Sequence, residues 1–155
     1  MTLRVTMTDP EKLAAWAEAR MGVDKGCLPP ETICLGILDG NEIKAVVSFN
    51  AFYSRYAAMH IASDSSRSWL TPKILRTVSR FAFDHLGLTR LNCTVPLHNK
   101  RAMVLAIKIG AVPTGLLENG ADDGSDAALF SVTPNRCPWL PTKKEPDDGQ
   151  VRTKS

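Results

Sequence analysis

Apolar and polar residues alternate in the first half of the chain with the period of β-strands. Two β-rich runs, Thr32 to Leu38 and Ile43 to Phe52, flank Asp39-Gly40-Asn41, which is typical of a tight hairpin turn. Tyr56 to Ser63 then supplies a third run of the same kind. We therefore expect these three segments to form an antiparallel meander.

After the meander, the period of the apolar residues changes to that of a helix. Thr71 stands directly before Pro72, a combination that favours a helix start, and the pattern continues to about His85. Gly87 is placed to end this helix in a left-handed conformation. The apolar stripe consists of Ile74, Leu75, Val78, Phe81, Ala82 and Leu86.

A second strand and helix follow. Leu91 to Leu97 reads as a strand, and Pro96 near its end favours an edge position or a splayed end, because proline donates no hydrogen bond to a neighbour. The helix predicted from Lys100 to Ile109 follows Asn99 and stops at Gly110. This order predicts an α+β fold in which the later strand pairing is parallel.

The outer parts of the chain complete one domain. Thr8-Asp9-Pro10-Glu11 predicts a helix start, with Thr8 or Asp9 as the capping residue. Thr114 to Leu117 and Ala127 to Thr133 read as the last hairpin. We expect a single domain over residues 1–133. The segment 134–155 is rich in Pro, Lys and Asp, so it is expected to be a largely disordered tail.

Composition narrows the class of protein. The chain has 155 residues, of which 44% are hydrophobic and 23% charged, enough for one domain with its own core. No apolar run approaches the length of a membrane span, and the first residues lack the apolar region of a signal peptide, so a cytoplasmic location is expected. The net charge of +3 disfavours nucleic acid as a partner.

The four cysteines, Cys27, Cys34, Cys93 and Cys137, are widely scattered. They form no C-x-x-C pair and have no histidine at zinc-binding spacing, so reduced, mostly buried thiols and no metal site are expected. Cys93 is a poor candidate nucleophile, because the sequence places no base beside it.

One sequence motif resembles a known family. The series Asn99-x-Arg101-Ala102-x-x-Leu105-x-x-Lys108-x-Gly110-Ala111 is similar to the closing motif of the GNAT N-acyltransferases. The run from Met59 through Trp69-Leu70-Thr71 to Phe83 is similar to GNAT-like proteins encoded by tailed bacteriophages. The resemblance covers roughly residues 32–132 and implies a mixed central sheet flanked by helices.

The resemblance also implies a site for acetyl-CoA as co-substrate. In that fold, the pantetheine arm pairs with a strand beside a V-shaped gap, and the pyrophosphate sits at a helix N-terminus. The strand here would be Met59 to Ser63 and its parallel neighbour Leu91 to Val95. The binding residues implied are Ile61, Ala62, Ser63, Arg67, Ser68, Trp69, Leu70, Thr71, Asn99 and Arg101.

For catalysis, the resemblance implies direct attack of an amine on the thioester. His60 is the candidate base, because an imidazole with a pKa near 6.5 can accept a proton at neutral pH. Asp64 and Asn50 are weaker candidates, for polarising or orienting the amine. Ala106 stands where many members carry a tyrosine that protonates the leaving thiolate, and residues 67–71 lack the glycines usual in the phosphate-binding loop.

These two departures leave a second hypothesis open, a non-catalytic virion or binding protein that kept the fold. Each site residue also has a structural alternative: Asn99 as a helix cap, His60 as an ordinary strand residue, and Trp69 as a core side chain. Arg67 and Arg101 could be solvated surface charges. The sequence does not choose between a protein and a small-molecule amine as acceptor, and it leaves a homodimer possible.

Overall fold

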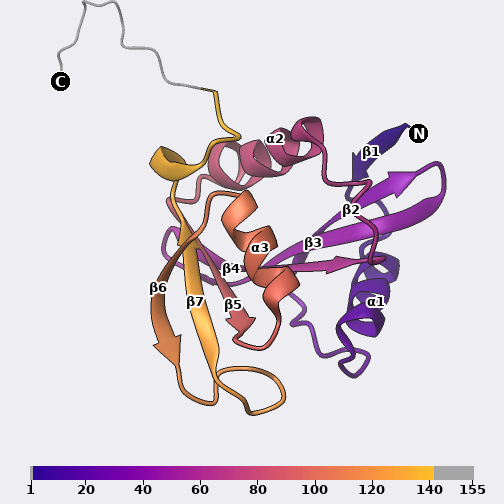
Figure 1. The fold of residues 1–155 in the computed structure, drawn as a ribbon. Coiled ribbons are helices and arrows are strands. Elements are labelled where there is room, and N and C mark those ends of the chain that lie inside the picture. Colours follow the sequence, from indigo (N-terminus) through magenta and orange to yellow (C-terminus); the bar gives the residue numbers. More distant parts are fainter. Residues whose placement is uncertain (1, 142–155) are drawn as a thin grey trace, which may run out of the picture.

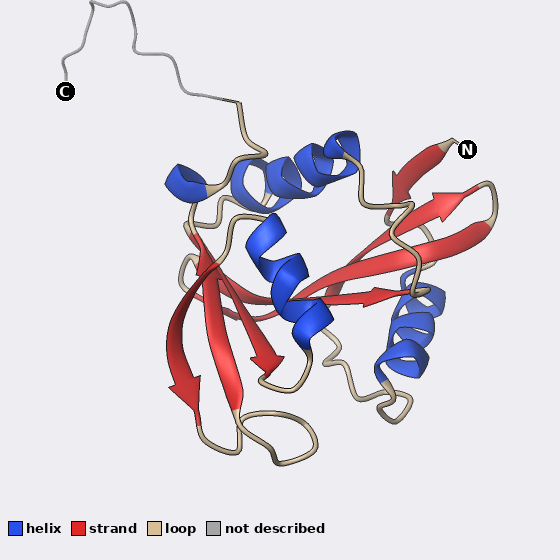
Figure 2. Cartoon of the chain, in the orientation of Figure 1, coloured by secondary structure: helices blue, strands red, loops and turns tan. Residues whose placement is uncertain are grey.

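A seven-stranded mixed sheet forms the centre of the computed structural model, which describes residues 2–141. The strand order across the sheet is β1-β2-β3-β4-β5-β7-β6. Figure 2 shows the strands in red. The strands are β1 (Leu3–Thr6), β2 (Ile33–Asp39), β3 (Glu42–Tyr53), β4 (Tyr56–Ser63), β5 (Arg90–Pro96), β6 (Val112–Leu117) and β7 (Ala127–Val132). The predicted α+β class is therefore confirmed.

The predicted meander is present as β2, β3 and β4, which pair antiparallel in chain order. Sequence analysis missed β1, which pairs antiparallel with β2 through Arg4 and Leu38. Because β1 is only four residues long and lies at the sheet edge, it leaves a short and partly exposed pattern.

Strands β4 and β5 are parallel, as predicted, but they pair only at one end. Their register runs from Tyr56 opposite Arg90 to Ala58 opposite Asn92 and then stops. Beyond it, β4 stays paired with β3 and β5 stays paired with β7 up to Pro96. The prediction of a splayed end is thus confirmed, whereas the alternative of an edge strand is not, because β5 lies between β4 and β7.

The helices cover the two faces of the sheet. They are α1 (Pro10–Met21), α2 (Pro72–Arg80), which continues as a π-helical turn (Phe81–His85), and α3 (Lys100–Lys108). Leu13 and Ala17 of α1 pack with Val46 and Ala62, whereas α2 and α3 pack with the alternate residues of the same strands. Since successive side chains of a strand face opposite sides, α1 lies on one face and α2 and α3 on the other (Figure 1).

The capping residues predicted from sequence are observed at the helix ends, except at the start of α1. The side chain of Thr71 accepts a hydrogen bond from the backbone N–H of Ile74 (3.2 Å), and Gly87 has a φ of 69°. Helix α1 begins at Pro10 as predicted, but the side chain of Asp9 caps nothing, because its φ of 64° places it in the left-handed region.

The C-terminal residues up to 141 pack against the domain. Cys137 is buried, and Trp139 Nε1 donates a hydrogen bond to the carbonyl oxygen of Lys108 (3.1 Å). The predicted disorder of Thr142 to Ser155 lies outside the described residues. Among residues 2–141, no helix has both the length and the apolar character needed to cross a bilayer.

Candidate functional site

The separation of β4 from β5 opens a cleft through the sheet, here called the interstrand cleft. Its volume is about 380 Å³. Beyond Ala58, the edge of β4 that faces β5 has no strand partner within the described part of the chain, so its backbone groups border the cleft. Helix α3 forms the third wall, with Ala102, Leu105 and Ala106. Of the residues predicted from sequence, the cleft is lined by His60, Ile61, Ala62, Ser63 and Asn99.

A second hollow, here called the loop groove, continues from the interstrand cleft. It has a volume of about 240 Å³ and lies between the loop after β4 and the start of α3. The two hollows share Ser63, Asn99, Ala102 and Leu105. The loop groove is lined by the predicted residues Ser63, Arg67, Trp69, Leu70, Asn99 and Arg101. A long, bent ligand could therefore occupy both hollows at once.

The start of α3 borders both hollows because Asn99 caps it. Asn99 Oδ1 accepts a hydrogen bond from the backbone N–H of Ala102 at 3.1 Å. Arg101, the second residue of α3, donates to the carbonyl oxygen of Ser65 at 3.1 Å and so holds the opposite rim of the groove. The structural alternative for Asn99 is therefore observed, and the same residue also faces the cleft.

Strand pairing brings His60 and Asn50 together. Their Nε2 and Oδ1 atoms lie 3.0 Å apart, and the Nδ2 of Asn50 donates to Thr32 Oγ1 at 3.2 Å. Asn50 is buried, whereas His60 is half-buried and lines the interstrand cleft. With the amide nitrogen committed to Thr32, its oxygen accepts from His60 Nε2–H, which leaves Nδ1 as the imidazole nitrogen with a free lone pair.

The surroundings of His60 favour its neutral form. Burial lowers the pKa of the imidazole from its ordinary 6.5, and the nearby carboxylate of Asp122 opposes part of this effect. Neutral imidazole is the form that can accept a proton. The electrostatics of the cleft therefore keep His60 available as a base at neutral pH.

Two other residues that line the cleft, Ala106 and Cys93, cannot take over proton transfer from His60. Ala106 is buried and lines the cleft, and its methyl side chain offers no proton donor. Burial raises the pKa of the Cys93 thiol to about 12, which keeps it protonated. The four cysteines are free thiols, and three of them are buried, as predicted.

Three predicted residues lie away from both hollows, and a fourth lies deep in the core. Asn50, Ser68 and Thr71 line neither hollow. The hydroxyl of Ser68 pairs with that of Ser66, and the hydroxyl of Thr71 caps α2. Trp69 is only 3% exposed, and its Nε1 donates to Ser63 Oγ at 3.3 Å, so the indole supports the loop from below. Asp64 is held by Lys44 and Ser66.

Sequence analysis missed three side chains that shape the site. Arg20 donates to the Ser63 carbonyl oxygen (2.9 Å) and the Ser65 hydroxyl (3.1 Å), which adds a second cation at this rim. Asp122 lines the cleft from the loop between β6 and β7, and Thr32 fixes Asn50. None of them belongs to a local motif, because each comes from a segment far from β4 in sequence.

The loop after α1 is fixed by a buried carboxylate. Glu18 is 3% exposed and accepts hydrogen bonds from the backbone N–H groups of Gly26 (3.0 Å) and Leu28 (2.8 Å). These bonds lower the pKa of the Glu18 carboxyl below its usual value. Helix α1 and its loop are thereby joined into one wall, with Met21 lining the cleft.

Sequence comparison gives no relative for this chain. No protein-family model matches it, and no curated protein sequence matches it either. The fold, by contrast, has many matches among solved structures.

Three of these structures illustrate the match. A GNAT-family acetyltransferase from Streptococcus pneumoniae shares 20% identity at a TM-score of 0.67, over 85% of this chain and 99% of that one. A mutant of spermidine N-acetyltransferase from Vibrio cholerae shares 13% identity at a TM-score of 0.67, over 85% and 92%. Ribosomal-protein-S5-alanine acetyltransferase from Vibrio fischeri shares 13% identity at a TM-score of 0.64, over 90% and 94%. The chain therefore has the fold of the GNAT acetyltransferases.

Proposed function

We propose that this protein is an acyl-CoA-dependent N-acetyltransferase that transfers the acetyl group of acetyl-CoA to an amine by direct attack. The observation that carries the proposal is the interstrand cleft, which has a neutral histidine at one wall and a capped helix start at another. The similar solved structures, which are acetyltransferases, support the same reading.

The hollows fit the shape and charge of the cofactor. The unpaired edge of β4 from Met59 to Ser63 offers backbone groups to an amide-bearing pantetheine arm. Arg67 and Arg101 line the loop groove, where guanidinium groups can bind pyrophosphate oxygens. Helix α2 begins directly after this loop, and its dipole adds to the attraction for an anion.

In the proposed reaction, His60 is the base and Asn50 the residue that positions it. The amine nitrogen attacks the thioester carbon and gives its proton to His60 Nδ1, while Asn50 holds Nε2–H. The carbon–sulfur bond then breaks, and the thiolate takes a proton from water because Ala106 has none to give. Asn50 thus acts through the histidine rather than on the amine.

Asp122 favours a cationic molecule as acceptor. Among residues 2–141, it is the one carboxylate that lines the interstrand cleft, and it is close enough to His60 to affect its pKa. A cationic acceptor would be attracted by this charge. Its reacting nitrogen attacks as the neutral amine, after its ammonium proton has passed to solvent. Among the similar structures, one acts on spermidine and another on a ribosomal protein by name, so both a small polyamine and a protein amine remain candidates.

The second hypothesis, a non-catalytic virion or binding protein, is favoured by Ala106 and by the absence of glycine from residues 67–71. It predicts that the fold persists while the cofactor site no longer binds. Phage origin remains a prediction of the sequence resemblance, and a cytoplasmic location remains a prediction of the composition.

Thermal unfolding with and without millimolar acetyl-CoA tests the binding half of the proposal. A ligand at 100 times its Kd stabilises the folded state by about 2.7 kcal/mol. We expect a clear rise in Tm that is lost in the Arg67→Ala/Asn99→Ala double variant. The matched control is Arg76→Ala, on the exposed part of α2 and outside both hollows.

Release of free thiol from acetyl-CoA, measured with a panel of polyamines and basic peptides, tests the catalytic half. Turnover that disappears in His60→Gln supports the enzyme. Binding of acetyl-CoA without turnover on any amine would favour the non-catalytic hypothesis, and an unchanged Tm would rule out both the cofactor site and the reaction.

A further inference from the structure

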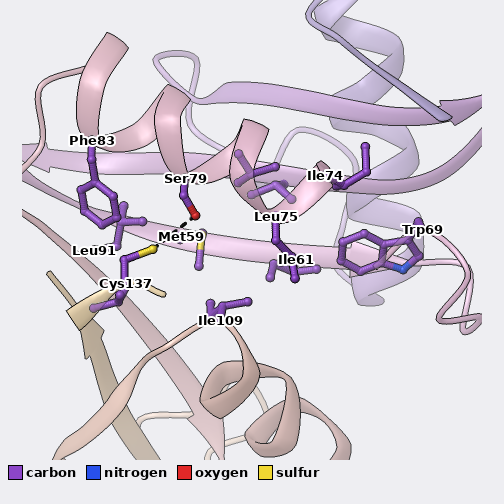
Figure 3. A pocket seen from close by; sticks show the side chains of 13 residues that line it. Met59, Ile61, Trp69, Ile74, Leu75, Ser79, Phe83, Leu91, Ile109 and Cys137 are labelled. Carbon is purple, nitrogen blue, oxygen red and sulfur yellow. Dashed lines mark hydrogen bonds between the residues drawn. The ribbon is translucent and has the colours of Figure 1, made fainter. Parts of the chain in front are cut away.

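A small apolar cavity lies between α2 and the sheet, next to the interstrand cleft. Its volume is about 30 Å³. Beside the cavity, Cys137 Sγ donates a hydrogen bond to Ser79 Oγ at 3.4 Å (Figure 3). Trp69 also lines the cavity, and its Nε1 donates to Ser63 Oγ, so these polar groups leave a water molecule few partners. A space of this kind stays dry and favours an apolar guest.

Three side chains separate this cavity from the interstrand cleft. Met59, Ile61 and Ile109 line both spaces. Met59 is an unbranched chain with three rotatable bonds, and such side chains adapt their shape at low cost. A rotation of Met59, without movement of the backbone, would therefore join the cavity to the cleft.

The alternation of β4 puts this cavity on the side opposite to the base. Met59 packs in the core beneath α2, whereas His60, the next residue, faces the other side of the sheet with Asn50. A thioester held between β4 and β5 would thus have the base on one face and the cavity on the other. An acyl chain directed away from the attacking amine would point toward Met59.

We propose that the site accepts acyl groups of three to four carbons, with the terminal carbons seated in the cavity behind Met59. This inference rests on the proposed function and extends it from acetyl to short-chain acyl groups. The cavity holds about two water-sized groups, which corresponds to the two carbons by which a butanoyl group exceeds an acetyl group. The reaction is unchanged: the amine nitrogen bonds to the carbonyl carbon, the carbon–sulfur bond breaks, and the amine proton passes to His60.

Calorimetric titration of the full chain with CoA, acetyl-CoA, butanoyl-CoA and octanoyl-CoA tests the inference without an acceptor. Burial of two methylene groups should make butanoyl-CoA bind roughly tenfold more tightly than acetyl-CoA. Octanoyl-CoA should lose this gain, because its chain exceeds the cavity.

Val78 offers a variant that changes the cavity and leaves the cleft intact. It lines the cavity but not the cleft, so Val78→Leu should fill the space and bring the butanoyl-CoA affinity down to that of acetyl-CoA. The affinity for CoA itself should stay unchanged. Val104→Leu makes the same chemical change at a residue of α3 that is 52% exposed, and it should keep the tenfold preference.

If Val78→Leu does not fold, Val78→Ala tests the same idea in the other direction, since a larger cavity should move the best chain length beyond four carbons. Equal affinities for acetyl-CoA and butanoyl-CoA in the unaltered chain would show that the cavity is only a packing void; the inference would then fall while the proposed function stands. Absence of binding by CoA itself would overturn both.

Discussion

The two faces of strand β4 differ in what their side chains do. On one face, His60 reaches Asn50, and Asn50 reaches Thr32, in a chain of polar contacts that opens into the interstrand cleft. On the other face, Met59 belongs to the main hydrophobic core beneath α2. One backbone thus supports a polar site and an apolar core one residue apart, because strand side chains alternate.

The face of β4 that carries His60, here called the polar face, is suited to chemistry. The face that carries Met59, here called the apolar face, is suited to stability. Asn50 is 6% exposed, yet both its amide nitrogen and its amide oxygen have hydrogen-bond partners. It can therefore hold His60 in one orientation. Phe49, the residue before it, is fully buried and packs near Phe81, with ring centroids 5.9 Å apart. Substitutions on the two faces should therefore separate activity from stability.

The largest effect is expected from removing the base on the polar face. His60→Gln should lower kcat by ~10²–10⁴-fold, the usual contribution of a general base, while the affinity for acetyl-CoA stays the same. Thiol release and calorimetric titration measure the two quantities. If His60→Gln kept the kcat of the unaltered chain, another group would have to be the base.

On the apolar face, Phe49→Ala should lower the free energy of unfolding by about 3–5 kcal/mol, because it leaves a cavity at a fully buried position. Urea unfolding measures the change. Asn50→Ala is the paired experiment: it should reduce kcat more than it reduces stability. If the two variants had the same effect on stability, the division between the faces would be wrong.

A smaller effect is expected from the two helix caps. Thr71→Ala and Asn99→Ala each remove a side chain that accepts a backbone N–H, which typically costs about 1 kcal/mol of stability. Only Asn99 lines the two hollows, so only its substitution should also weaken acetyl-CoA binding. If the two variants bound acetyl-CoA with equal affinity, the role of Asn99 would be only to cap α3.

The smallest effect concerns pH. Because His60 must be neutral to act as a base and burial lowers its pKa below 6.5, kcat/KM should stay high near neutral pH and fall only as the pH drops through that lowered value. Asp122 raises this pKa, so Asp122→Asn should move the acidic limb of the profile to still lower pH. A shift of the limb toward higher pH would show that Asp122 does not act on His60 in this way.

The sequence by itself determined the strands from β2 onward and the two helix starts at the site, although it missed β1. The alternation of apolar and polar residues predicted the bounds of β2 to β4 to within a residue or two. Thr71 and Asn99 predicted the starts of α2 and α3, because capping is a contact between residues three apart in the chain. Pro96 predicted the end of β5, although it did not show that β5 lies inside the sheet.

Only the tertiary structure decided which residues meet. Asn50 and His60 are ten residues apart and come together through the register of β3 with β4, which is set by the whole buried face of the meander. Asp122, Arg20 and Thr32 reach the site from three other segments, and the cavity behind Met59 depends on how α2 and α3 pack. Local pattern carries no information about these contacts, because packing between distant segments depends on the shapes of all the side chains between them.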